Sequence, residues 1–178
     1  MARHIVLLRG INLGARNRVA MGELREALED AGFKDVRTHL QSGNVVLESP
    51  AKPESVARKC ERVIRERFGL EIAVVGRTRA DLARVVKRNP LGKVAKDPKR
   101  YQVSFLAAKL AANVVRELEA AAAESEQVVV IGREVYAWHP ETIARSRLWT
   151  MLAGKGLGVT ATSRNWTTVE ALLALAEE

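Results

Sequence analysis

The chain contains few aromatic residues, a single cysteine and no long apolar run. Its 178 residues include only three Trp, two Tyr and three Phe, so we expect a core built mainly from Val, Leu, Ile and Ala. Cys60 has no partner for an internal disulfide, which favours a cytoplasmic location. The apolar run Ile5–Leu8 is too short for the central region of a signal peptide, and no stretch is long enough to span a bilayer. These absences predict a cytoplasmic globular protein without a membrane segment.

The basic residues are concentrated in one short segment. The net charge is +8. Residues 77–100 carry nine basic and two acidic residues, whereas the segments before and after are near neutral. Two prolines and a glycine also interrupt this segment, which is typical of a domain boundary. We therefore expect a first domain over residues 1–90, a basic linker over 91–99 and a second domain over 100–178.

Apolar spacing predicts the same order of elements in both halves of the chain. In the first half, we expect strands over 3–10, 36–41, 44–48 and 71–76, and helices over 21–31, 56–68 and 82–86. In the second half, we expect strands over 101–107, 127–131, 134–138 and 158–162. The helices of that half are expected over 110–123, after His139-Pro140 and near the end of the chain, where Thr167 and Glu170 fit a capping box.

Each half therefore follows the order β-α-β-β-α-β and ends in one more helix. That order is typical of the ferredoxin-like fold, a four-stranded antiparallel sheet with helices on one face. We predict an α+β protein of two such lobes.

Polar residues follow the first predicted strand in the segment LLRGINLGARNRVAM. The segment lacks both the G-x-G-x-x-G spacing of a dinucleotide-binding loop and the G-K-[ST] of a Walker loop. Arg9, Asn12 and Asn17 precede a helix N-terminus, where backbone N–H groups attract anions. The alternative interpretation is that the glycines and asparagines here only supply positive-φ conformations.

Two further polar clusters occur at SGN, which contains Ser42 and Asn44, and at RNW, which contains Arg164 and Asn165. In a ferredoxin-like lobe the first strand pairs with the third, so RGIN and SGN are expected to meet at one end of the sheet. An arginine beside a helix N-terminus, as in RNW, can hold an anion or simply fix the last helix in place.

Metal and nucleophile signals are weak. The three histidines lie on separate predicted elements, and there is no Cys-x-x-Cys, so no metal and no cofactor is expected. Cys60 lies on the apolar face of its helix, which indicates a buried and inert thiol. No Ser-His-acid order is evident, and the sequence assigns no reaction.

The basic segment offers a second hypothesis, binding to nucleic-acid phosphates. Its candidate residues are Arg77, Arg79, Arg84, Lys87 and Arg88. Ferredoxin-like modules that bind RNA stack bases on sheet aromatics, but the inner strands VLLRG and NVVLE contain none. A solvated basic face is the alternative interpretation.

The segments LLRGINLGARNRVAMGELREALEDAGFKDVRTHLQSGNVVLES and SRLWTMLAGKGLGVTATSRNWTTVEAL resemble the opening and closing patterns of the bacterial family called domain of unknown function 1697. Leu13, His39 and Thr167 stand where Val, Tyr and Asn are usual. The resemblance implies a bacterial cytosolic protein with two α+β lobes and no established activity. The family's motif residues here are Arg9, Gly10, Asn12, Gly14, Ser42, Gly43, Asn44, Ser146, Arg164, Asn165 and Trp166.

We hypothesise that an anionic or phosphorylated small molecule binds in a polar pocket lined by the RGIN, SGN and RNW motifs. Clusters rich in Asn, Ser, Gly and Arg suit oriented recognition of a ligand better than a diffuse charge does. The candidate ligand-binding residues are Arg9, Asn12, Asn17, Ser42, Asn44, Ser146, Arg164 and Asn165. Nucleic-acid binding through residues 77–100 is the alternative, and the oligomeric state is left open.

Overall fold

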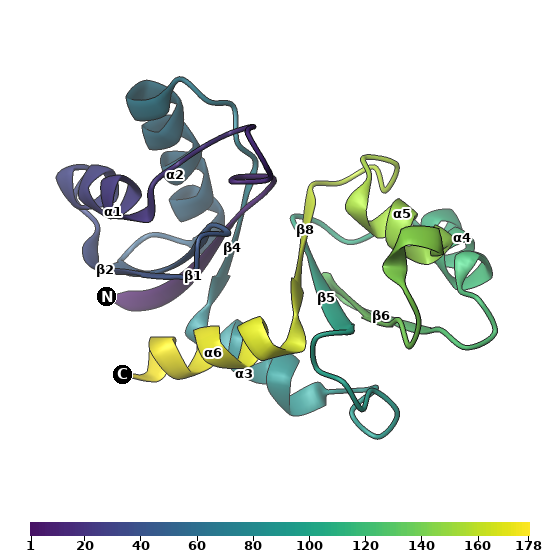
Figure 1. Ribbon diagram of the computed structural model, residues 1–178. Helices are drawn as coiled ribbons and strands as arrows, with labels where there is room; N and C mark the ends of the chain where they lie inside the picture. Colours follow the sequence, from purple (N-terminus) through teal and green to yellow (C-terminus); the bar gives the residue numbers. More distant parts are fainter. The chain divides into compact units, whose positions relative to one another are not determined.

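The computed structural model describes residues 1–178 and divides into two compact units. Unit 1 comprises Met1–Arg84 and Ala171–Glu178, and unit 2 comprises Val85–Glu170. The division falls inside two helices, α3 (Arg79–Arg88) and α6 (Trp166–Glu177) (Figure 1). Each unit contains one four-stranded antiparallel sheet, which confirms the predicted α+β fold.

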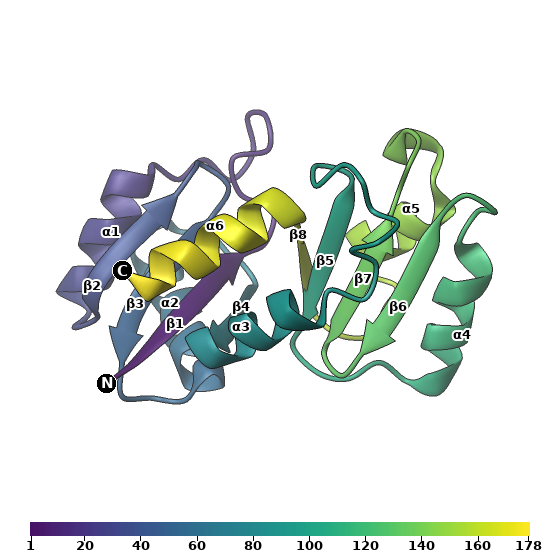
Figure 2. The ribbon, with the colours of Figure 1, turned by 90° about the horizontal axis from the view of Figure 1, so that it is seen from below.

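The first unit follows the predicted order of strands and helices. Its elements are β1 (Ala2–Leu8), α1 (Met21–Asp30), β2 (Lys34–His39), β3 (Asn44–Ser49), α2 (Pro53–Phe68) and β4 (Val74–Thr78). The strands lie in the order β2-β3-β1-β4 (Figure 2), and β1 is antiparallel to both of its neighbours. This strand order is the one expected for a ferredoxin-like unit.

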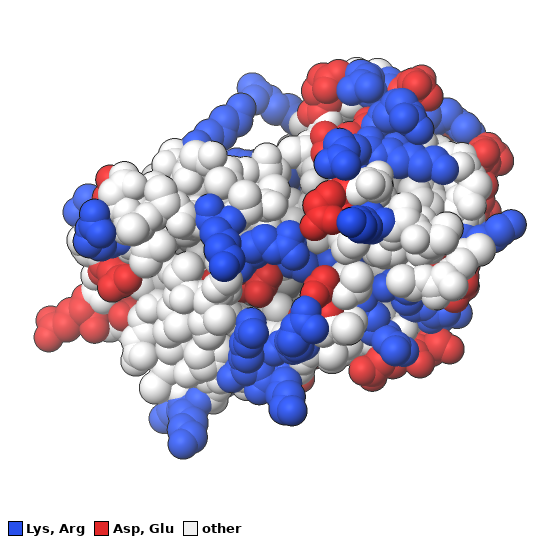
Figure 3. All heavy atoms as spheres, turned by 180° about the vertical axis from the view of Figure 1, so that it is seen from behind, with Lys and Arg blue, Asp and Glu red and all other residues white.

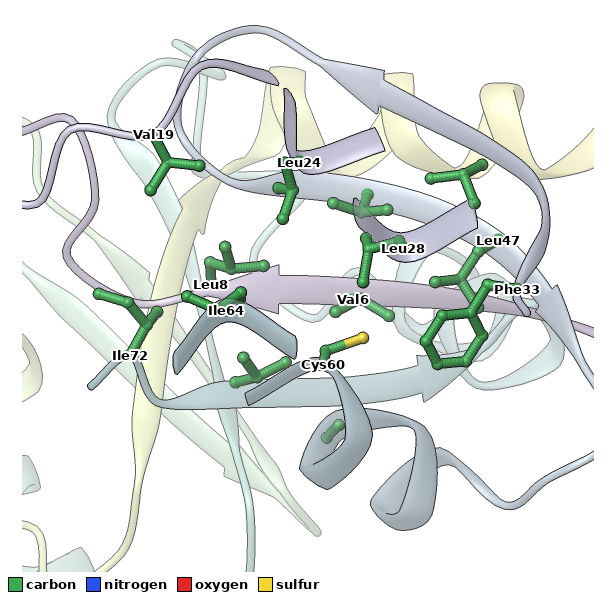
Figure 4. Close-up of a cluster of buried hydrophobic side chains, with 14 of the residues drawn as sticks. Val6, Leu8, Val19, Leu24, Leu28, Phe33, Leu47, Cys60, Ile64 and Ile72 are labelled. Atoms are coloured by element: carbon green, nitrogen blue, oxygen red, sulfur yellow. The ribbon is translucent and has the colours of Figure 1, made fainter. Parts of the chain in front are cut away.

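The main core of unit 1 covers one face of this sheet. Val6 and Leu8 of β1 point toward Leu24 and Leu28 of α1 and toward Cys60 of α2 (Figure 4). Side chains alternate along a strand and recur every three or four residues along a helix, so each element presents one apolar face to this cluster. Burial raises the pKa of the Cys60 thiol to about 12, in agreement with an inert core thiol.

The opposite face of β1 is buried as well. Ile5 and Leu7 on that face are fully inaccessible to solvent, as the continuous apolar run of this strand predicted. The last turns of α6 belong to unit 1, and Arg3 Nη1 donates to the Ala176 carbonyl oxygen over 3.5 Å. Unit 1 is therefore assembled from both ends of the sequence.

Unit 2 repeats the order of unit 1, but its second helix has 7 residues where that of unit 1 has 16. Its elements are β5 (Tyr101–Leu106), α4 (Ala112–Ala121), β6 (Gln127–Ile131), β7 (Glu134–Trp138), the 3₁₀ turn η1 (Ile143–Arg145), α5 (Arg147–Ala153) and β8 (Ala161–Asn165). The strands lie in the order β6-β7-β5-β8. Leu106, Leu118, Val135, Leu148 and Leu152 form the centre of an apolar cluster on the face covered by α4 and α5.

The last strand and the last helix start elsewhere than the sequence predicts. The predicted strand over 158–162 is observed as β8 over Ala161–Asn165, because the polar residues of this segment pair with β5. Ser163 Oγ lies 2.6 Å from Ser104 Oγ across that pair. The predicted capping box at Thr167 is wrong, since Asn165 Oδ1 accepts from the Thr168 N–H over 2.9 Å and caps α6.

The segment after His139-Pro140 forms two short helices instead of one. Thr142 caps η1 by accepting from the Ala144 N–H, and Ser146 caps α5 by accepting from the Trp149 N–H. Two caps so close together interrupt the predicted helix.

None of the helices in the chain combines the length and apolar character that a bilayer crossing requires.

Candidate functional site

The structure brings the RGIN and SGN segments together at one end of the unit 1 sheet. The Leu8 N–H donates to the Gly43 carbonyl over 2.9 Å, and Asn12 Nδ2 donates to the Gln41 carbonyl over 2.6 Å. Gly43 has φ +80°, and a Cβ on it would lie 2.7 Å from the Leu8 Cβ. Only glycine fits this position without displacing the strand.

Asn12 organises the opening loop. Its Nδ2 also donates to the Val19 carbonyl, and its Oδ1 accepts from the Val19 N–H, both over 2.8 Å. Asn17 Nδ2 donates to the Gly10 carbonyl over 3.1 Å. Both asparagines have positive φ, 53° and 50°, a conformation that asparagine tolerates better than most residues. These bonds give the two asparagines a role in fixing the loop.

Asn44 and Ser42 form a similar arrangement in the neighbouring loop. Asn44 is fully buried, and its Nδ2 donates to the His39 carbonyl over 3.1 Å and to Ser42 Oγ over 3.0 Å. Asn44 pairs with Leu7 across the sheet. Arg9 directly follows the last residue of β1, so it lies at the end of the sheet where Asn44 begins β3.

The arginines of the opening loop carry its charge. Arg16 and Arg18 are exposed, and Arg9 is half-buried, with its backbone N–H bonded to the Ala73 carbonyl. Residues 9–22 contain no aspartate or glutamate. This loop is fixed by internal hydrogen bonds and carries three arginines. It can therefore attract an anion without the entropic cost of ordering the loop on binding.

Ser146, a candidate residue in unit 2, belongs to a buried polar cluster. Its hydroxyl donates to Glu126 Oε2 over 2.6 Å, and His139 Nδ1 lies 2.6 Å from the same oxygen. Glu126 Oε1 accepts from the Ala123 N–H. We name these three residues, Glu126, His139 and Ser146, the Glu126 cluster.

The Glu126 cluster lacks the geometry of a catalytic triad. The serine hydroxyl donates to the carboxylate, whereas a triad serine bonds to a histidine nitrogen that removes its proton. His139 is buried, its Nε2 has no hydrogen-bond partner, and its ring meets Trp149 edge-on with centroids 5.8 Å apart. Desolvation raises the pKa of Glu126, but the hydrogen bonds from Ser146, Ala123 and His139 outweigh it and bring that pKa below its ordinary value.

The RNW residues are ordered by contacts within unit 2. Arg164 Nη1 donates to Thr162 Oγ1 over 2.7 Å and to the Ser163 carbonyl over 2.9 Å. Burial lowers the pKa of Arg164 to about 10, which leaves it charged at neutral pH. Trp166 stacks on Tyr101 with ring centroids 4.6 Å apart and an interplanar angle of 13°. These residues lie in unit 2 and the RGIN and SGN loops lie in unit 1, so a pocket shared by all three motifs stays a prediction.

The basic candidates of residues 77–100 differ in their exposure. Arg77 is only 1% exposed and donates to the Gly76 carbonyl, so its guanidinium is not available to phosphates. Arg79, Arg84, Lys87 and Arg88 are exposed along α3, and Arg84 pairs with Asp81. Figure 3 shows basic side chains in several separate groups, many of them beside acidic ones.

No group of three or more His, Cys, Asp or Glu side chains in residues 1–178 is arranged to hold a metal ion.

Unit 1 contains a cavity of about 430 Å³ that the sequence patterns did not predict. Its charged lining residues, among them Arg3, Arg79 and Glu177, come from elements far apart in the sequence. No motif connects such residues.

Comparisons with known proteins identify the family and the fold. A family model described as "Protein of unknown function (DUF1697)" matches residues 1–136. The structure of the conserved bacterial protein SP0830 from Streptococcus pneumoniae is similar to this chain, with a TM-score of 0.80, 21% identity and 98% of each chain covered. None of the curated proteins matches.

Proposed function

Because this chain belongs to DUF1697, a family of unknown function, we propose a function from the site itself: the protein binds an anionic or phosphorylated small molecule in the cytoplasm through the loops at the end of β1. One observation supports this proposal most. The loops containing RGIN and SGN are held together by Asn12, and residues 9–22 contain three arginines and no aspartate or glutamate. Guanidinium groups on a rigid loop are suited to carboxylate and phosphate recognition.

The contacts suggest a division of roles among the candidate residues. Arg9 contacts the anion, and Arg16 and Arg18 provide the surrounding positive charge. Asn12, Asn17, Ser42 and Asn44 keep the two loops in place through the hydrogen bonds already described. Contributions from Ser146, Arg164 and Asn165 of unit 2 are a further part of the proposal.

A thermal-shift screen with phosphorylated metabolites and nucleotides tests this function, because a ligand that binds only the folded state stabilises it. At a concentration of about one hundred times Kd, the expected stabilisation is about 2.7 kcal/mol. Arg9→Ala should abolish the shift while the ligand-free protein stays folded. Arg25→Ala is the matched control, since Arg25 is an exposed arginine of α1 in the same unit.

Two results would contradict the proposal. The first is a shift that Arg9→Ala, Arg16→Ala and Arg18→Ala all leave unchanged. The second is an Arg9→Ala protein that melts earlier but binds the ligand with wild-type affinity, which would give Arg9 a structural role only.

Nucleic-acid binding is the second candidate, and the exposed basic side chains of α3 favour it. Affinity for a short duplex or single strand should then fall steeply with salt, because bound phosphates release counterions. Replacing Arg84, Lys87 and Arg88 by Glu together should abolish binding. Weak binding that survives this triple change would indicate nonspecific charge attraction only.

A further inference from the structure

A cavity of about 430 Å³ opens in unit 1 at the start of β1. Its lining comes from the first residues of β1, from β3, from the end of β4 and the start of α3, and from the last turn of α6. β1 has seven residues, and at about 3.3 Å per residue its two ends lie roughly 20 Å apart. The cavity is therefore separate from the RGIN and SGN loops, which follow the other end of the same strand.

Three charged side chains of the lining, Arg3, Glu48 and Glu178, belong to a network of ion pairs. Arg3 Nη2 lies 2.9 Å from Asp35 Oδ2 and 2.8 Å from Glu48 Oε1. Arg37 continues the network, with Nε 3.1 Å from Asp35 Oδ1 and Nη1 2.8 Å from Glu178 Oε2. In this network two guanidinium groups face three carboxylates, and each of the five side chains has at least one ion-pair partner.

Two charged side chains of the lining have no such partner. Arg79, the first residue of α3, is exposed and forms no ion pair. Its neighbours are fixed, because the Asp81 N–H donates to Thr78 Oγ1 and the Thr78 N–H donates to Asp81 Oδ2. Glu177, in the last turn of α6, is also exposed and forms no ion pair. Among the charged side chains of the lining, Arg79 and Glu177 are thus the cation and the carboxylate outside the ion pairs, and they lie on different elements.

We propose that this cavity binds a zwitterionic small molecule of the amino-acid or dipeptide class, with its carboxylate at Arg79 and its ammonium group at Glu177. A polyanion would meet the carboxylates of Glu48, Glu177 and Glu178, and a cation without a carboxylate would leave Arg79 unpaired. The volume lies near the lower end of the roughly 300–1,000 Å³ of small-molecule sites. That size suits a ligand no larger than a short peptide.

Isothermal titration calorimetry with L-alanine and with L-alanyl-L-alanine tests the proposal on the full chain. We expect saturable binding of at least one of the two. Acetylating the amino group or amidating the carboxyl group of that ligand should each weaken binding by about tenfold or more, because each modification removes one of the two ion pairs.

Substitutions locate the site. Arg79→Gln and Glu177→Gln should each weaken binding of the unmodified ligand by about tenfold. Arg84→Gln and Glu170→Gln are the matched controls, since they lie in the same two helices, are exposed and do not line the cavity. Amide chemical shifts in ¹⁵N-labelled protein should change at residues 78–81 and 176–178 and stay constant at residues 10–18.

Three outcomes would overturn the proposal. One is the absence of saturable heat from both probes up to about 10 mM. Another is undiminished binding of a ligand with a blocked amino or carboxyl group. The third is binding that Arg79→Gln and Glu177→Gln leave unchanged. None of these results bears on the loop site, whose test uses different ligands and Arg9.

Discussion

Units 1 and 2 share one order of strands and helices but rely on different interactions. In unit 1, α1 and α2 have ten and sixteen residues and cover the sheet with a continuous apolar cluster. In unit 2, the position of α2 is taken by η1 and the seven-residue α5. The Glu126 cluster fixes the start of that short helix through Ser146. One topology can therefore be stabilised by the apolar faces of two amphipathic helices or by a short helix anchored through buried hydrogen bonds.

The strongest test of this comparison removes apolar packing from unit 1. Leu28 of α1 is fully buried in the core cluster, and Leu28→Ala should lower the free energy of unfolding by about 2–5 kcal/mol. Hydrogen exchange should show the loss at the amides of β1 and β3. Leu13→Ala, at a side chain that is 69% exposed, should change stability by no more than about 0.5 kcal/mol. Equal losses for both variants would contradict the role given to the core.

The next test removes the charge of the Glu126 cluster. Glu126→Gln should lower the stability of unit 2 by about 1–3 kcal/mol, because the carboxylate accepts hydrogen bonds from His139, Ser146 and the Ala123 N–H. All three tryptophans lie in unit 2, so their fluorescence reports this change during urea denaturation. Glu124→Gln, at an exposed neighbour, is the control.

The same cluster predicts a dependence of stability on pH. The pKa of Glu126 is lower in the folded state than in the unfolded chain, so ionised Glu126 stabilises the fold above the unfolded pKa of about 4.3. That contribution is lost as the pH falls below this value and through the folded pKa. In Glu126→Gln the acid-side decrease should be smaller. An identical acid-side decrease in wild type and variant would contradict the prediction.

The smallest expected effect concerns the loop of unit 1. Asn12→Ala removes three hydrogen bonds to the backbone and should cost about 1–2 kcal/mol. Asn17→Ala removes one and should cost less. Amide exchange should accelerate at residues 10–19 in both variants and most in Asn12→Ala. If Asn17→Ala had the larger effect, Asn12 would not be the residue that organises the loop.

Most of the fold was predictable because the spacing of the apolar residues along the chain indicates which side chains become buried. The continuous apolar run of β1 predicted a strand buried on both faces, and Leu24 and Leu28 recur at helical spacing on α1. The approach of RGIN to SGN also followed from the antiparallel pairing of β1 with β3.

Polar segments were harder to interpret. The polar residues 163–165 lie beyond the predicted strand over 158–162, yet they belong to β8, where Ser163 Oγ bonds to Ser104 Oγ of β5. Asn165 caps α6 although Thr167 with Glu170 fits the capping pattern. The Glu126 cluster and the cavity at Arg3 were not predictable, since their residues meet only through tertiary structure and share no local pattern.

The assignment of residues 171–178 to unit 1 has a consequence for how the protein is made. On the ribosome, these residues emerge after every residue of unit 2, at roughly 5–20 residues per second. Until then, Arg3 lacks the Ala176 carbonyl and Arg37 lacks Glu178. The unit whose chain begins first is thus completed last, and a ribosome stalled near residue 165 would hold an unfinished unit 1.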